Sequence, residues 1–319
     1  MNIIETHALS RVYGKRRAVD SLDMRVAAGE IYGFVGKNGA GKSTAMKMIA
    51  GLVRPTSGSV ELFGAQRRAR EGFSRVGALI EDPGILPTFS ALENLMCKAL
   101  ALGVVRPNAH CRELLELVGL ADTGSLRVKK FSLGMKQRLG LALALVGGPD
   151  LLLLDEPFNG LDPESTRAMR GALVRLNRER GVTMVISSHV LDQLDRMATS
   201  FGVIRSGRMV RELSMDDLHR ECGNSIRIRT NDPARTLAIL EEALPGTALR
   251  AEPDGSILAS AAVRHAATSF GGAAADPMAP SAEDVARTLT DHGQLILELS
   301  HLERDIEEYF VELMGGADA

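Results

Sequence analysis

The sequence contains little cysteine, and none of it forms a recognisable motif. Only Cys97, Cys111 and Cys222 occur among 319 residues, and they lie far apart without a C-x-x-C pair. A disulfide framework or a cysteine-ligated zinc site needs more cysteines at closer spacing. We therefore expect a chain that works in a reducing cytoplasm, without disulfides and without such a zinc site.

A long apolar run, a leader segment and a large net charge are also missing. The longest apolar stretch, residues 139–155, is interrupted by "GGPD" and falls short of the ~18 uninterrupted residues of a membrane span. The opening "MNIIETHALS" has no basic segment followed by an apolar core, so we expect no signal peptide. The net charge of −2 gives no general attraction to nucleic acid or anionic membrane. These absences predict a soluble chain without a nucleic-acid partner, and we interpret the basic clusters at 14–17 and 67–70 as solvated surface.

The length of 319 residues predicts two domains, one of them large. Over residues 1–214, expected strands alternate with expected helices, which is typical of a parallel α/β core covered by helices. The expected strands are short ones within 1–35, followed by 58–64, 76–82, 151–157 and 183–189. The expected helices are 42–52, those of a mostly helical segment at about 90–148, 163–181 and 190–198.

Residues 215–319 predict a small α+β accessory domain. Strands are expected at 225–230 and 256–262, with a helix at 232–244 capped by Asp232. The low-complexity stretch 271–280 is expected to be a flexible connection. The last helix places Ile306, Phe310 and Leu313 on one stripe, which is either part of the domain's own core or a regulatory or dimer-stabilising face.

The stretch "GKNGAGKST", residues 36–44, concentrates glycines, a lysine and two hydroxyls between an apolar run and a helix. Gly36, Gly41, Lys42 and Ser43 satisfy the phosphate-loop pattern G-x-x-x-x-G-K-[ST] in its strand–loop–helix context. Backbone N–H groups would wrap phosphate oxygens, Lys42 would reach the terminal phosphates, and Ser43 would bind Mg²⁺. A glycine-rich turn without a ligand is the alternative. The residues expected to hold a nucleoside triphosphate are Gly36, Lys37, Asn38, Gly39, Ala40, Gly41, Lys42, Ser43 and Thr44.

The run "LLLLDEP", residues 151–157, places two consecutive carboxylates at the end of an apolar strand. Charge at a buried strand end is costly unless it has a partner. Asp155 is suited to holding Mg²⁺ through water, and Glu156 is suited to orienting or deprotonating an attacking water. A helix N-cap region is the structural alternative. We predict Asp155 as a metal ligand and Glu156 as the catalytic base.

Further motifs make the sequence resemble the ATP-binding subunits of ABC transporters. "FSLGMKQR", residues 131–138, resembles the family's signature LSGGQ-x-QR, and "NGLDP" at 159–163 resembles its D-loop. "ISSHVLDQLD" resembles the switch-histidine segment, and "LIEDP" lies where the family has its glutamine loop. All motifs occur in family order within about residues 1–215. The resemblance implies a P-loop NTPase cassette of the ABC type over 1–214, with a RecA-like α/β core, an antiparallel β subdomain and a helical subdomain at about 90–143.

The resemblance also implies the nucleotide and the metal. It implies ATP, with Tyr13 of "RVYG" stacked on adenine and Val19 as a further nucleotide contact. It implies Mg²⁺, with Ser43, Asp155 and Glu81 as the metal-binding residues.

The resemblance finally implies a catalytic set and partners. Lys42, Glu156 and His189 would be catalytic, with His189 as the switch. Ser132 and Gly134 would complete the ATP site of a partner in a head-to-tail dimer, formed by two copies or with a similar cassette. The chain would drive a separate transmembrane permease as a peripheral protein on the cytoplasmic face of the cell membrane.

Three positions depart from the family pattern. Glu81 replaces a glutamine and adds negative charge, Leu133 brings a side chain where the signature has glycine, and Met135 replaces a glutamine. The pattern looks most like the bacitracin- and lantibiotic-resistance branch, whose subunits work with permeases that expel antimicrobial peptides or drugs. One alternative is a soluble non-transport ABC ATPase acting on a macromolecular complex, which predicts two cassettes or a long charged coiled-coil insertion. The other is a binding module without hydrolysis, against which the intact catalytic set argues.

Overall fold

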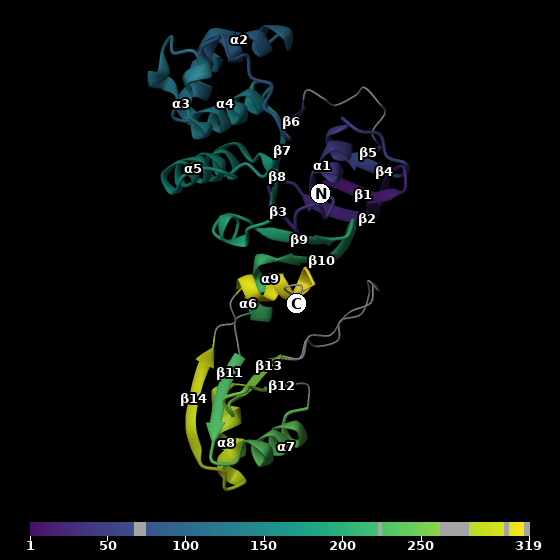
Figure 1. The fold of residues 1–319 in the computed structure, drawn as a ribbon, viewed down its shortest axis with the longest axis vertical. Helices are drawn as coiled ribbons and strands as arrows, with labels where there is room; N and C mark the ends of the chain where they lie inside the picture. Colours follow the sequence, from purple (N-terminus) through teal and green to yellow (C-terminus); the bar gives the residue numbers. More distant parts are fainter. Residues whose placement is uncertain (67–74, 223–224, 246, 262–280, 303–305, 316–319) are drawn as a thin grey trace. The chain divides into compact units, whose positions relative to one another are not determined.

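The computed structural model describes residues 1–66, 75–222, 225–245, 247–261, 281–302 and 306–315 (Figure 1). Its contacts divide the chain into two units, Met1–Ser214 with Phe310–Ala319, and Met215–Tyr309. The second unit is thus inserted between Ser214 and Phe310, and the final segment, which we expected in the accessory domain, groups with the first unit. The stretch 271–280 and the basic cluster 67–70 lie outside the described residues.

The centre of the first unit is a six-stranded sheet in the order β10-β9-β3-β8-β7-β6. Neighbouring strands are parallel except β10 and β9. Helix α1 (Lys42–Ala50) comes after β3, and α5 (Pro163–Arg180) comes after β7. This arrangement confirms the predicted α/β class. The strands are β3 (Ile31–Val35), β6 (Val76–Leu79), β7 (Leu151–Asp155), β8 (Thr183–Ser188), β9 (Ser200–Arg205) and β10 (Arg208–Ser214).

The sequence did not predict β9 or β10, and Gly202 shows why β9 was hard to find. Glycine in the middle of a strand weakens the strand pattern. A Cβ on Gly202 would lie 2.0 Å from the hydroxyl oxygen of Tyr32, so glycine makes room for that buried side chain. The Tyr32 hydroxyl then donates to Glu212 of β10 at 2.6 Å. The glycine is therefore explained by a contact far away in the sequence.

An antiparallel sheet in the order β2-β1-β4-β5 accompanies the central sheet. We expected short strands before residue 35, but β1 and β2 are long and form a hairpin around Gly14. Their inward side chains share one apolar core with α1 and β7, including Met24, Ile49 and Leu153. The strands are β1 (Asn2–Tyr13), β2 (Arg16–Ala27), β4 (Ser57–Leu62) and β5 (Ala65–Gln66).

The expected helical segment is confirmed as three helices, α2 (Ala91–Ala101), α3 (Pro107–Leu117) and α4 (Leu133–Leu145). Figure 1 shows them grouped together, away from α1. The helix expected at 190–198 is wrong, because only a short 3₁₀ turn occurs at Leu191–Gln193. The Ser188 hydroxyl accepts from the N–H of Val190 and lies 3.0 Å from Oε1 of Gln193, which favours a turn here.

The second unit is a β-α-β-β-α-β arrangement preceded by α6 (Met215–Cys222). Its antiparallel sheet has the order β12-β13-β11-β14, which is the ferredoxin-like topology. Asp232 caps α7 by accepting from the N–H of Arg235, as the sequence predicts. Helix α9 (Ile306–Leu313) crosses the boundary between the units. The elements are β11 (Ser225–Thr230), α7 (Pro233–Ala243), β12 (Thr247–Ala251), β13 (Ile257–Ala261), α8 (Ala282–Asp291) and β14 (Ile296–Leu302).

Among the described residues, no helix is both long enough and apolar enough to cross a bilayer.

Candidate nucleotide site

The predicted phosphate loop lies between β3 and α1, and two of its glycines are required by space. Gly41, the N-cap of α1, has φ 113°, and a Cβ there would lie 2.5 Å from the backbone oxygen of Ala18. A Cβ on Gly36 would lie 2.5 Å from the backbone oxygen of Ile204. The loop therefore packs tightly against β2 and β9 and ends at a helix N-terminus, which is a favourable place for phosphate.

A pocket of about 410 Å³ lies beside this loop. A pocket of this size suits a small ligand such as a nucleotide. Its walls come from the β1–β2 hairpin, the phosphate loop, the start of α1 and the residue after β7. The structure thus brings the loop, the predicted adenine-stacking residue and the predicted base together. The lining residues are Tyr13, Arg16, Ala18, Asn38, Gly39, Gly41, Lys42, Ser43, Thr44 and Glu156.

Lys42 is a buried cation in the wall of this pocket, only 6% exposed. Its Nζ donates to the backbone oxygen of Gly36 at 2.6 Å and lies 3.3 Å from Oε1 of Glu156. A buried ammonium needs such partners because desolvation is costly. Lys42 therefore connects the phosphate loop to the end of β7.

Glu156 is held in a strained backbone conformation by groups on both sides. Its φ is 48°, in the left-handed region that non-glycine residues rarely adopt. Its N–H donates to Oγ of Ser187 at 2.9 Å, and the same hydroxyl donates to Oδ1 of Asp155 at 2.5 Å. Oε2 lies 2.7 Å from Nδ1 of His189. Ser187, which the sequence did not single out, therefore bonds the Asp155 carboxylate and the backbone N–H of Glu156, while His189 bonds the Glu156 carboxylate.

The other carboxylate oxygen of Glu156, Oε1, faces the pocket without a hydrogen bond among the described residues. Oε1 is buried and has no hydrogen-bond partner among the described residues, although the Lys42 ammonium is close. A buried acceptor without a hydrogen bond is unusual and calls for a ligand or a water. Because Glu156 lines the pocket, this oxygen is available to a molecule bound there.

Oxygen donors for Mg²⁺ are present at the same place. Ser43 is the second residue of α1 and lines the pocket, while Asp155 ends β7 directly before Glu156. The hydrogen bond from Ser187 uses Oδ1 of Asp155, which leaves Oδ2 for a cation. Mg²⁺ prefers a few hard oxygen ligands and keeps several waters. Ser43 lines the pocket and Asp155 precedes a lining residue, so their oxygens are of the type that would hold the ion, and this role stays a prediction for both.

Glu81, the third predicted metal-binding residue, has a different partner. Its Oε1 lies 2.5 Å from Nζ of Lys47, and its side chain is 65% exposed. It is absent from the described lining of the pocket. A metal-binding role for Glu81 stays a prediction, and the structure supplies no contact that supports it.

In the β1–β2 hairpin, Tyr13 lies as expected, whereas Val19 and Arg16 do not. Tyr13 lines the pocket as predicted, with the guanidinium of Arg11 4.5 Å from its ring centroid. Val19 is fully buried in the apolar core, and its neighbour Ala18 lines the pocket instead. Arg16 also lines the pocket, although we interpreted cluster 14–17 as solvated surface. The alternation of a strand could have found it, because Arg16 lies two residues before Ala18 on the same face.

Asp20 ties this hairpin to the turn between β9 and β10. It accepts from Arg17 at 2.5 Å and from Nε of Arg208 at 2.7 Å. Hydrogen bonds from Arg17 and then from Arg208 hold the pKa of Asp20 below its usual range. The N–H of Asp20 also donates to the backbone oxygen of Gly207 at 2.8 Å. The hairpin that carries Arg16 and Ala18 is thus fixed to the central sheet.

Ser132 and Gly134 lie at the start of α4 and do not line the described pocket of their own chain. The Ser132 hydroxyl caps α4 by accepting from the N–H of Met135 at 3.2 Å. A Cβ on Gly134 would lie 2.9 Å from Oγ of Ser165, so glycine is needed for this approach to α5. The two predicted signature residues are therefore separate from the site that the other residues form.

The departure at Leu133 has a structural counterpart. Leu133 is 52% exposed, and its Cδ2 lies where it would meet a Cβ on Gly160 at 2.7 Å. Gly160 belongs to the "NGLDP" motif, so the two motifs pack against each other within one chain. The added side chain at 133 is thus accommodated by the missing side chain at 160.

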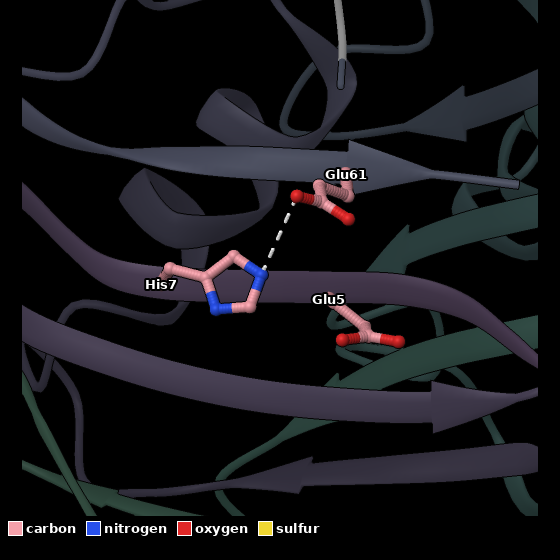
Figure 2. Close-up of side chains that lie close together, drawn as sticks. All are labelled: Glu5, His7 and Glu61. Carbon is pink, nitrogen blue, oxygen red and sulfur yellow. Dashed lines mark ion pairs between the residues drawn. The ribbon is translucent and has the colours of Figure 1, made fainter. Parts of the chain in front are cut away.

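A separate group of possible metal ligands occurs on the antiparallel sheet. Figure 2 shows Glu5 and His7 on β1 with Glu61 on β4, and Nε2 of His7 lies 3.7 Å from Oε1 of Glu61. Such ion pairs between exposed side chains contribute little to stability. These residues do not line the described nucleotide pocket.

Comparisons with known proteins agree with this geometry. The sequence profile of the family described as "ABC transporter" matches residues 19–159. The bacitracin transport ATP-binding protein BcrA of Bacillus licheniformis is 35% identical, and the match covers 98% of each chain. The lantibiotic transport ATP-binding protein SrtF of Streptococcus pyogenes is 38% identical, over 67% of this chain and 92% of that protein. The dimeric structure of a bacterial ABC transporter cassette has a TM-score of 0.61 at 23% identity, covering 66% of this chain and 98% of that one. The match to BcrA extends over both units of this chain.

Proposed function

Since this chain belongs to the ATP-binding subunits of ABC transporters, which hydrolyse ATP to power a separate membrane permease, we propose that it drives export of an antimicrobial peptide. One observation carries the site assignment: Lys42, Glu156 and His189 form a continuous chain of contacts beside the phosphate loop. In these contacts, Lys42 is the cation that would bind phosphate, Glu156 is the carboxylate that would accept a proton from water, and His189 is the imidazole that holds Glu156.

The proposed reaction uses these groups in sequence. The loop amides and Lys42 hold the phosphates of ATP, and the Lys42 ammonium exchanges its contact with Glu156 for the terminal phosphate. Oε1 of Glu156 accepts the proton of the attacking water, whose oxygen bonds to the terminal phosphorus as the bond to ADP breaks. His189 keeps the carboxylate oriented through Oε2. Ser43 and Asp155 would hold Mg²⁺, which would supply positive charge that neutralises the phosphates.

The proposed active form is a head-to-tail dimer, with a second copy or with a similar cassette. Ser132 and Gly134 lie outside the described pocket of their own chain, so they are available to a partner's nucleotide. The fold of the first unit matches a cassette that has been solved as a dimer. Donors from the partner would stabilise charge on the terminal phosphate, which makes ATP the ligand that closes the dimer.

The proposed substrate and place of action follow from the relatives. BcrA and SrtF are named for bacitracin and lantibiotic transport, and both molecules are antimicrobial peptides. We place this chain on the inner face of the cell membrane, bound to a permease encoded separately. No observation favours the alternative of a non-transport ABC ATPase.

The test is resistance in a sensitive bacterial host. The chain and its cognate permease are expressed together, and the inhibitory concentrations of bacitracin, a lantibiotic and a non-peptide drug are measured. We expect a rise for a peptide antibiotic with the wild type and no rise with Lys42→Ala. A chain that hydrolyses ATP but protects against no peptide would reject the substrate assignment. Protection that survives Lys42→Ala would reject the nucleotide site.

A further inference from the structure

The end of the chain packs on the nucleotide-binding unit. Phe310 of α9 is 1% exposed and meets Phe201 of β9 edge to face, with ring centroids 5.4 Å apart and an interplanar angle of 68°. Among the described residues, the apolar core of the second unit does not include Phe310. The predicted stripe of the last helix thus contributes its aromatic member to the first unit.

Phe201 transmits this contact to the strand before the phosphate loop. A Cβ on Gly33 of β3 would lie 2.7 Å from the Phe201 ring, so the ring rests on bare backbone. Two residues after Gly33, β3 ends and the phosphate loop begins. Phe310 therefore packs against the Phe201 ring, and that ring packs against β3, the strand that leads into the phosphate loop.

The residues after Phe310 also lie close to the phosphate loop. Arg205 donates from Nη1 to the backbone oxygen of Leu313 at 3.4 Å. A pocket of about 340 Å³ is lined jointly by loop residues 37–40, residues 204–206 at the end of β9 and the start of the following turn, and Met314 with Gly315. The C-terminal segment, the turn after β9 and the phosphate loop are thus neighbours within the first unit.

The turn itself is bonded to the loop. The N–H of Gly207 donates to the backbone oxygen of Ala40 at 2.8 Å. On the other side, the backbone oxygen of Ile204 leaves no room for a side chain at Gly36. In close-packed structure of this kind, a shift of the turn displaces the loop.

We propose that Phe310 and Arg205 are positioning residues for nucleotide binding: segment 310–315 holds the β9–β10 turn, and the turn holds the phosphate loop in its binding conformation. The inference rests on the proposed nucleotide role of the loop. Amides that are already aligned bind phosphate without reorganisation. Loosening the support lowers the population of the aligned loop, and the apparent affinity for ATP falls in the same proportion.

The test compares Phe310→Ala with Phe310→Leu and with the control Val311→Ala, an exposed neighbour on the same helix, in the full-length chain. The Kd of a fluorescent ATP analogue with Mg²⁺ is measured for each, together with KM and kcat for hydrolysis. If the aligned loop falls to about one tenth of the population, Kd and KM rise about tenfold in Phe310→Ala. We expect a smaller rise in Phe310→Leu, wild-type values in Val311→Ala, and little change in kcat.

Amide hydrogen exchange separates positioning from general destabilisation. In Phe310→Ala, exchange over residues 33–41 should accelerate while exchange over α3 stays as in the wild type. Arg205→Gln should accelerate the same peptide without altering the Phe201 contact. Wild-type affinity in Phe310→Ala, or equal acceleration in α3, would overturn the inference. A wild type that fails to bind ATP would instead refute the nucleotide function on which it rests.

Discussion

Replacing Glu156 by glutamine removes the proposed base while keeping its shape. Glu156 lies between two basic groups, with Oε1 3.3 Å from Nζ of Lys42 and Oε2 2.7 Å from Nδ1 of His189. The glutamine amide can accept a hydrogen bond through its oxygen, but it cannot take a proton from water. We therefore expect ATP to bind while hydrolysis is lost.

The structure gives the expected size of both effects. A positioned base contributes a factor on the order of 10²–10⁴ in rate, which corresponds to about 3–5 kcal/mol in the activation barrier. The attraction between unit charges 3.3 Å apart is about 5 kcal/mol at an effective dielectric constant of about 20. The cost of desolvating both charges offsets much of it, since the Lys42 and Glu156 side chains are only 6% and 20% exposed. Freeing Lys42 from this pair should leave the Kd for ATP unchanged or up to about fivefold tighter.

Three measurements check this prediction. Phosphate release gives the hydrolysis rate, a fluorescent ATP analogue gives the Kd, and size-exclusion chromatography with ATP and Mg²⁺ reports dimer accumulation. Glu164→Gln is a matched control, because Glu164 is an exposed carboxylate in the first turn of α5. Normal hydrolysis by Glu156→Gln would remove Glu156 from its role. A variant that binds ATP but stays monomeric would contradict the completion of the site by Ser132 and Gly134 of a partner.

Motifs contained in one short segment were predicted well from the sequence. The phosphate loop needs glycines next to a strand end and a lysine at a helix start, and all of these are neighbours in the chain. Asp155 and Glu156 follow four leucines, and the structure confirms their position at the end of β7, while their roles stay predictions. The parallel sheet and the helical segment followed from alternation of patterns over longer stretches, and the structure confirms both.

Roles that depend on distant contacts could not be predicted in this way. Val19 and Ala18 are neighbours on a strand and face opposite sides, so a one-residue error exchanges core for pocket. The register of β1 and β2 shifts between Arg11 and Val12, which no local pattern reveals. Ser187 meets Asp155 only because β8 lies beside β7, and Phe310 meets Phe201 only because the chain returns to β9 after the second unit.

Four further predictions follow from single contacts. Lys42→Ala should abolish tight ATP binding in a fluorescent-nucleotide titration, because the loop loses its buried cation, and an unchanged Kd would refute that role. Glu81→Gln should keep or raise the ATPase rate with the permease present, because the exposed carboxylate pairs with Lys47 and does not line the described pocket, and complete loss of turnover would reveal a catalytic role. Arg16→Ala should raise the KM for ATP about twofold to fivefold, since one partly solvated positive charge is lost from the pocket. An unchanged KM would mean that Arg16 lines the pocket without contributing to ATP binding. Asp20→Asn should lower the midpoint of thermal unfolding at pH 7. The pKa of Asp20 is depressed in the folded chain, so its stabilising effect is complete above the unfolded value of about 3.9 and is lost as the pH falls through the lower folded value. The difference in the midpoint between wild type and variant should therefore be constant from about pH 5 to about pH 7 and should shrink below about pH 4. A difference that persists unchanged at about pH 3 would mean that the two arginines stabilise the hairpin by packing and not by their bonds to an ionised carboxylate.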